Sequence, residues 1–137
     1  MARRFSRPPG SAKRHVGSAL RPRLEAARLD LRALYRALDR MRLAQGLPAE
    51  LRLLQELDAD LAEALWVLDQ PPGRFDLSAL ARDTLASLSR LGSAREALLR
   101  TLDGASRAQV EERAAATRPL LSPEDAYLEI PGRDPLA

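Results

Sequence analysis

Between residues 20 and 70, the apolar side chains recur with a spacing that constrains the fold more than any other feature. Alternating intervals of three and four residues place them on one face of an α-helix. The first run comprises Leu20, Leu24, Ala27, Leu31, Leu34, Leu38 and Met41, and the second comprises Leu54, Leu57, Leu61, Ala64 and Leu68. Gly46 and Pro48 lie between them, where glycine suits a helix end and proline the first turn of the next helix. We therefore predict an antiparallel αα-hairpin, about 19–45 and 48–69, with a coiled-coil-like seam.

The composition extends the helical prediction to the whole chain. Only five of the 137 residues are aromatic, and the β-branched apolar residues are three valines and one isoleucine. The core must therefore be built from leucine and alanine, which favour helices over sheets. We predict an all-α fold, a helical bundle built on the hairpin.

Three shorter helices follow the hairpin in the sequence pattern. Their expected ranges are about 77–91, 94–103 and 107–117. Asp76 is a suitable N-cap for the first, and Gly92 is placed to end it. Ser93 and Glu96 have the spacing of a capping box for the second, and Ser106 offers a similar start for the third. The bundle is thus expected to span residues 18–118.

Both ends of the chain differ from this central part. Residues 1–17 contain a Pro-Pro-Gly sequence at 8–10, which interrupts a helix, so we predict a flexible arm there. Residues 119–137 contain four prolines and are predicted to form an extended tail. We expect a single bundle flanked by two irregular segments.

The positive charge is concentrated at the N-terminus. Residues 1–23 hold seven basic side chains and no acid, whereas the rest of the chain holds 15 basic and 19 acidic groups. The seven are Arg3, Arg4, Arg7, Lys13, Arg14, Arg21 and Arg23. Such an arm can bind nucleic-acid phosphates, dock on a protein or act as a solubilising tail. The Pro-Pro-Gly sequence argues against the amphipathic helix of an organellar transit peptide.

The two hairpin helices carry charges of opposite sign. Arg28, Arg32, Arg36 and Arg40 recur every four residues and are expected on the outer surface of the first helix. The second helix is acidic, so we expect the two flanks to pair with each other. Its acids at 56, 60 and 63 share one face, but without imidazoles nearby a solvated face is the better interpretation than a metal site.

Several apolar residues fall outside the predicted seam. Trp66 occupies a position that faces away from it, and Leu29 and Leu43 also lie outside it. In the tail, Tyr127, Leu128 and Ile130 form an apolar segment that packs on its own bundle or is captured by a partner. These six residues are our candidate protein-binding residues.

Catalytic chemistry finds little support in the sequence. There is no cysteine, and His15 is the only histidine. No phosphate-binding loop, dinucleotide motif or paired metal-ligand spacing occurs, so we expect no cofactor. A helix-turn-helix around Gly92 would offer DNA bases little besides Arg95 and Arg100. No apolar run is long enough for a membrane span, and we expect a cytoplasmic protein.

The sequence therefore predicts a non-enzymatic helical interaction protein, a subunit or adaptor of a larger assembly, with protein partners or self-association. The alternative is a nucleic-acid-binding accessory protein that uses the basic arm. A binding titration with and without the arm distinguishes the two.

Overall fold

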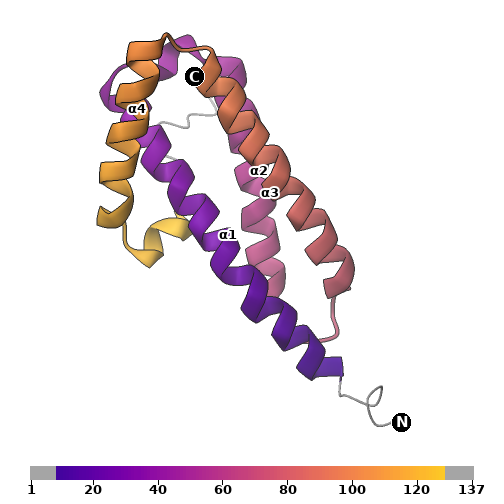
Figure 1. Ribbon diagram of the computed structural model, residues 1–137. Helices are drawn as coiled ribbons and strands as arrows, with labels where there is room; N and C mark the ends of the chain where they lie inside the picture. Colours follow the sequence, from indigo (N-terminus) through magenta and orange to yellow (C-terminus); the bar gives the residue numbers. More distant parts are fainter. Residues whose placement is uncertain (1–8, 129–137) are drawn as a thin grey trace.

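The computed structural model describes the backbone of residues 9–128 and the side chains of residues 19–128, and its regular structure is entirely helical (Figure 1). The α-helices are α1 (Pro9–Arg40), α2 (Pro48–Leu68), α3 (Leu77–Arg100) and α4 (Gly104–Thr117). The short 3-10 helices are η2 (Ala44–Gly46), η3 (Arg118–Leu120) and η4 (Pro123–Tyr127). The prediction of an all-α fold is confirmed.

Helix α1 lies at the centre of the bundle. It forms the predicted antiparallel hairpin with α2 through η2, but it ends at Arg40 instead of near residue 45, and Arg42, with φ 57°, takes the left-handed conformation that we expected at Gly46. Helix α2 packs chiefly on α3, and α1 packs chiefly on α4 and η4 (Figure 1). All five residues from Leu31 to Tyr35 are buried. Because one helical turn contains 3.6 residues, such a run is covered on every side. The core therefore surrounds α1, and the hairpin seam is only one part of it.

The N-terminal end of α1 corrects the predicted boundary. The helix begins at Pro9 instead of near Ser18, so the backbone of residues 9–17, which the sequence assigned to the arm, is part of α1. Proline at the first helical position is favourable because its missing N–H would have no partner there. Pro22 lies in the helix interior on an exposed side, where solvent can reach the carbonyl that it leaves without a donor. The predicted arm at residues 1–8 lies outside the described residues.

Helix α3 corrects a second boundary, because Gly92 and the Ser93–Glu96 spacing do not divide it. The chain runs as one helix through the predicted break, and the helix-turn-helix interpretation fails for the same reason. Leu91, Ala94 and Leu98 are buried along one face, so the apolar stripe continues in register past the glycine. Burial of that stripe outweighs the roughly 1 kcal/mol that an interior glycine costs. The predicted N-cap is correct: the Asp76 carboxylate accepts from the backbone of residues 78 and 79 at 3.0 and 3.2 Å.

This arrangement makes Gly92→Ala an expected stabilising substitution. A Cβ atom at residue 92 meets no heavy atom within 4 Å. Removing the backbone freedom of glycine from an unstrained helical position raises the free energy of unfolding by about 0.5–1 kcal/mol. Urea denaturation followed by circular dichroism measures the change. The matched control is Ala97→Gly, at an exposed position of the same helix, which should lower the free energy by a similar amount. A loss of stability in Gly92→Ala would contradict the continuous helix.

Helix α4 covers one side of α1. It begins at Gly104, three residues before the predicted start, because Asp103 and not Ser106 is the N-cap: its carboxylate accepts from the Ser106 backbone N–H at 2.8 Å. That hydrogen bond, followed by one from the Ser106 hydroxyl, lowers the pKa of Asp103. Val110 and Ala114 are buried, so this weakly apolar helix contributes to the core.

Residues 118–128 fold back along α1, whereas the sequence predicted an extended tail. Helices η3 and η4 both contact α1. The Asp125 carboxylate accepts from the Ser122 backbone N–H at 2.8 Å and caps η4. Ala126 is completely buried, and Leu121 nearly so. We call residues 121–128 the C-terminal strap.

Candidate interaction surfaces

A charged cluster inside the bundle joins α1 to α2. The Arg28 guanidinium donates to both carboxylate oxygens of Asp58, at 2.9 and 3.1 Å, and Arg32 Nη1 lies 3.3 Å from Oδ1. Arg32 is only 1% exposed, and the other two side chains are also buried. The sequence had placed both arginines on the outer surface. That prediction is wrong because both guanidinium groups bind Asp58 of α2, and the strap, which lies far along the chain, reaches Arg28 through the Leu128 carbonyl.

The buried cluster positions neighbouring elements. Arg32 Nη1 also donates to the carbonyl of Arg28 at 3.1 Å, and Arg28 Nη2 reaches the Leu128 carbonyl at 3.4 Å. The cluster thus connects α1, α2 and the last described residue of the strap. Because burying charges is costly, such a cluster contributes more to the relative placement of its elements than to net stability.

Further polar contacts hold the strap on α1. The Tyr127 hydroxyl donates to the Glu25 carboxylate and accepts from Arg21 Nη1 at 3.3 Å, and Arg36 lies 4.0 Å from Asp125. Burial and the hydrogen bond to Glu25 raise the pKa of Tyr127. Of the two interpretations for this segment, packing on its own bundle therefore describes residues 121–128. Tyr127 and Leu128 nevertheless stay about half exposed.

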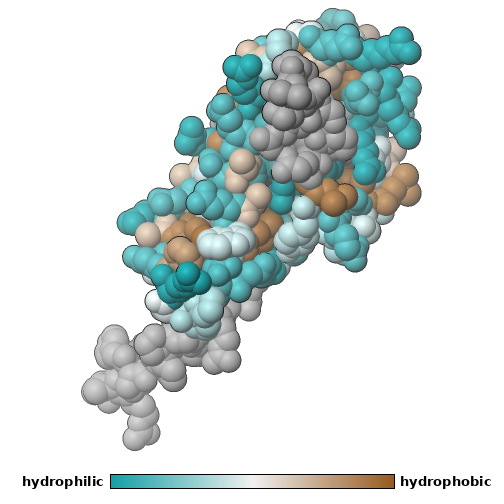
Figure 2. Space-filling view, turned by 180° about the vertical axis from the view of Figure 1, so that it is seen from behind, coloured by the Kyte–Doolittle hydropathy of each residue, from teal (hydrophilic) through white to brown (hydrophobic). Residues whose placement is uncertain are grey.

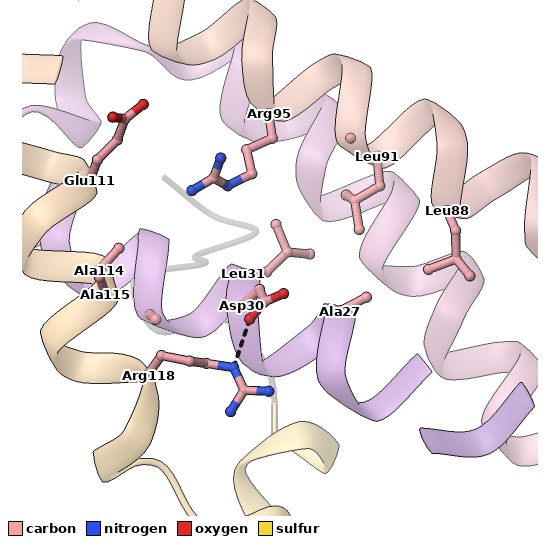
Figure 3. A pocket seen from close by; sticks show the side chains of 12 residues that line it. Ala27, Asp30, Leu31, Leu88, Leu91, Arg95, Glu111, Ala114, Ala115 and Arg118 are labelled. Atoms are coloured by element: carbon pink, nitrogen blue, oxygen red, sulfur yellow. Dashed lines mark hydrogen bonds and ion pairs between the residues drawn. The ribbon is translucent and has the colours of Figure 1, made fainter. Parts of the chain in front are cut away.

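A cleft of about 460 Å³ lies between α1, α3 and α4 (Figure 3). Small and apolar side chains line much of it, among them Ala27, Leu31 and Leu91, and charged groups surround them. Figure 3 shows Arg95 reaching from α3 towards the space between the helices, and Arg118 Nε bound to Asp30 at 2.6 Å. None of the twelve lining residues is Ser, Thr, Cys, His or Tyr. The lining therefore offers an apolar contact between charges and no hydroxyl or thiol nucleophile.

An exposed aromatic pair lies where α2 leads into α3. Trp66, on the last turn of α2, is 55% exposed, and Phe75, in the following loop, is 37% exposed. Their ring centroids are 6.0 Å apart with an interplanar angle of 73°, an edge-to-face arrangement. Trp66 faces outward, as its place in the heptad indicated, and Phe75 covers only part of it. We call these two residues the aromatic pair.

The acids of α2 beside the aromatic pair are also exposed. Glu56, Asp60 and Glu63 lie on the solvent side of the helix, and we call them the acidic face. Within residues 19–128, the ion pairs of α2 use only Asp58 and Asp69, so the acidic face has no ion-pair partner there. The expected mutual neutralisation of the two hairpin helices is therefore limited to two carboxylates.

The remaining predicted partner residues fall into different environments. Leu29 is buried in the core, which contradicts its proposed role as leftover surface, because α1 is covered on that side as well. Leu43 is half-buried against the core, and Ile130 lies outside the described residues. The sequence reasoning missed Phe75 and the half-exposed Leu53, because neither belongs to the apolar stripe of its segment.

The predicted basic residues are only partly described. Arg21 Nη2 is bound to Asp69 at 2.6 Å, and Arg23 is exposed. Lys13 and Arg14 lie on α1, but their side chains are outside the described set. Arg3, Arg4 and Arg7 precede the described residues. Of the seven, Arg21 is thus engaged within the molecule.

Neither a metal site nor a membrane segment is found in the described part of the chain. No three carboxylate or imidazole groups of residues 19–128 come together as a metal site requires. Among the helices of residues 9–128, none combines the length and the apolar character that a bilayer crossing needs. Comparison with protein-family models, curated proteins and solved structures yields no match to this chain.

Proposed function

We propose that this protein is a non-enzymatic helical interaction protein, a subunit or adaptor of a larger assembly, and that the aromatic pair is its main contact. The observation that carries this proposal is the exposure of Trp66, the only tryptophan of the chain, beside a second exposed ring. Tryptophan is enriched among the residues that dominate binding energy at protein interfaces. A tryptophan more than half exposed on a helix otherwise packed in a bundle is therefore a natural anchor for a partner.

The surroundings of the aromatic pair support this role. Charged groups flank it, including the acidic face on α2 and the Arg21–Asp69 pair at the end of that helix. An apolar centre inside a polar rim is the usual anatomy of a protein interface. The rest of the molecule is a scaffold that holds α2 and the following loop in place.

Co-purification from cells that express the protein tests this proposal. Full-length wild type and Trp66→Glu are tagged and isolated, and the proteins that accompany each are compared. The control is Leu120→Glu. Leu120 is 83% exposed on η3, which packs on α1 and α4, so this variant introduces the same charge at a different exposed apolar position. We expect a partner that is retained by wild type and the control and lost with Trp66→Glu. Identical partners for all three chains, with Trp66→Glu folded by circular dichroism, would refute the role of the aromatic pair.

A nucleic-acid-binding function is the alternative, and the seven basic residues without an acid in residues 1–23 favour it. Engagement of about five phosphates predicts a log–log salt slope near −4.5 on duplex DNA. Deleting residues 1–17 would remove the first turns of α1, so the variant should replace the five basic residues of this range by alanine. The alternative would be supported if wild type binds duplex DNA with this salt slope and the alanine variant does not bind with this slope.

A further inference from the structure

Three features meet at the end of the bundle where α1 begins. The first is the aromatic pair, and the second is the acidic face of α2. The third is the start of α1, whose first turns extend past the ends of α2 and α3 (Figure 1). Seen from behind, some apolar residues lie near this end among hydrophilic ones, and others lie farther along the molecule (Figure 2). The aromatic pair and the acidic face are exposed, and the start of α1 supplies basic residues at the same end.

The register of α1 against α2 explains why one copy cannot join these features. Arg21 of α1 is bound to Asp69, directly after the last residue of α2. Residues 9–17 therefore continue beyond that helix, about 13 Å at 1.5 Å per residue. This stretch carries Lys13 and Arg14 and no acid. Within one molecule, α1 carries these basic residues away from the acidic face.

We propose that a second copy of this chain covers this end, so that the basic first turns of α1 in each copy lie along the acidic face of the other. The inference rests on the proposed function and names its partner. The complementary charges are both present in one chain: the basic residues lie in the first turns of α1, and the acidic face runs along α2 from Glu56 towards the same end of the bundle. If a two-fold axis passes near the aromatic pair, the contact of α1 with the acidic face occurs twice, once in each direction. Both surfaces are then used, and the assembly closes as a dimer. The aromatic pairs of the two copies meet at its centre.

The two kinds of contact have different roles in the dimer. The ionic contacts set the orientation and make the association depend on salt, and the aromatic rings supply the apolar contact.

Sedimentation velocity of the purified full-length protein tests the dimer. We expect a monomer–dimer equilibrium that weakens as salt is raised. Because Trp66 lies at the centre of the proposed interface, Trp66→Ala should raise the dissociation constant by about thirtyfold or more. Leu120→Ala, the exposed control on η3, should leave it unchanged. A monomer at every concentration, or a dimer indifferent to Trp66→Ala, would overturn the inference.

Charge exchange tests the pairing itself. One variant carries Asp60→Arg and Glu63→Arg, and the other carries Lys13→Glu and Arg14→Glu. Alone, each variant places like charges in both contacts and should lose the dimer. When the two variants are mixed, the arginines introduced on the acidic face of one copy meet the glutamates introduced on α1 of the other. The second contact joins the unchanged basic α1 of the first copy to the unchanged acidic face of the second. Both contacts then pair opposite charges, so a heterodimer should form. Two variants that are folded by circular dichroism but stay monomeric when mixed would overturn the proposed contact.

The two proposals fail in different ways. A monomeric purified protein that still retains a Trp66-dependent partner in cells refutes the second copy and supports the interaction function. A dimer that forms through Trp66, with no other protein retained, supports both proposals, and the assembly that the aromatic pair joins is then the dimer itself. A monomer that retains no Trp66-dependent partner refutes both.

Discussion

Asp58→Ala is expected to lower the free energy of unfolding by about 3–5 kcal/mol, the largest effect of any single substitution considered for this protein. The Asp58 carboxylate is the acceptor shared by two buried guanidinium groups, at 2.9 and 3.3 Å. Removing it leaves both positive charges in the interior without this counter-charge. Neither arginine can turn to solvent without disturbing the packing around α1, because both side chains are buried.

Urea denaturation followed by circular dichroism measures this effect. The matched control is Asp60→Ala, two residues along the same helix but exposed, which should change the free energy by less than about 0.5 kcal/mol. A second comparison replaces the whole cluster by apolar residues, Arg28→Met, Asp58→Leu and Arg32→Met together. That triple variant should be far closer to wild type than Asp58→Ala, because no buried charge remains. A loss below about 1 kcal/mol in Asp58→Ala would contradict the burial of the cluster.

Leu61→Ala is expected to lower the free energy of unfolding by about 2.7–5 kcal/mol. Leu61 is completely buried at the centre of the α2 seam. Shortening it removes buried apolar surface and leaves a cavity, which close-packed helices fill only in part. Helix propensity does not oppose the change, because alanine is the best helix former. The loss therefore measures packing alone.

Thermal and urea unfolding of Leu61→Ala are compared with those of Leu53→Ala. Leu53 lies on the same helix but is 42% exposed, so its truncation should cost less than about 1 kcal/mol. The ratio between the two losses tests whether the seam of α2 faces the core as described. Equal losses would indicate that α2 is rotated from this orientation.

Local signals in the sequence predicted the elements that depend on neighbouring residues. The Asp76 cap of α3 follows from a short-range hydrogen bond between a side chain and the next turn. The start of α2 follows from Pro48, which takes the first helical position. The outward direction of Trp66 follows from its phase in the heptad. None of these features requires knowledge of a distant part of the chain.

Local signals failed where a distant element determines the outcome. Gly92 resembles a helix terminator, but burial of Leu91 and Leu98 on one continuous face keeps α3 intact. Arg28 and Arg32 resemble an exposed ridge when the hairpin is considered alone. The residues that bury them include the strap, about 100 positions later in the chain. Helical periodicity contains no information about such contacts. The pairing of opposite charges between α1 and α2 was therefore expected, but the burial of the cluster could not be predicted.

By itself the sequence determined that this chain folds as an all-α hairpin bundle, because leucine and alanine at helical spacing leave no other way to bury its apolar surface. It also determined that the excess of basic groups lies at the N-terminus, since charge is a property of composition. Only the tertiary structure decided which charges are buried and which apolar residues stay exposed. Solvent exposure depends on what packs against a surface, and for α1 the covering elements lie far along the chain.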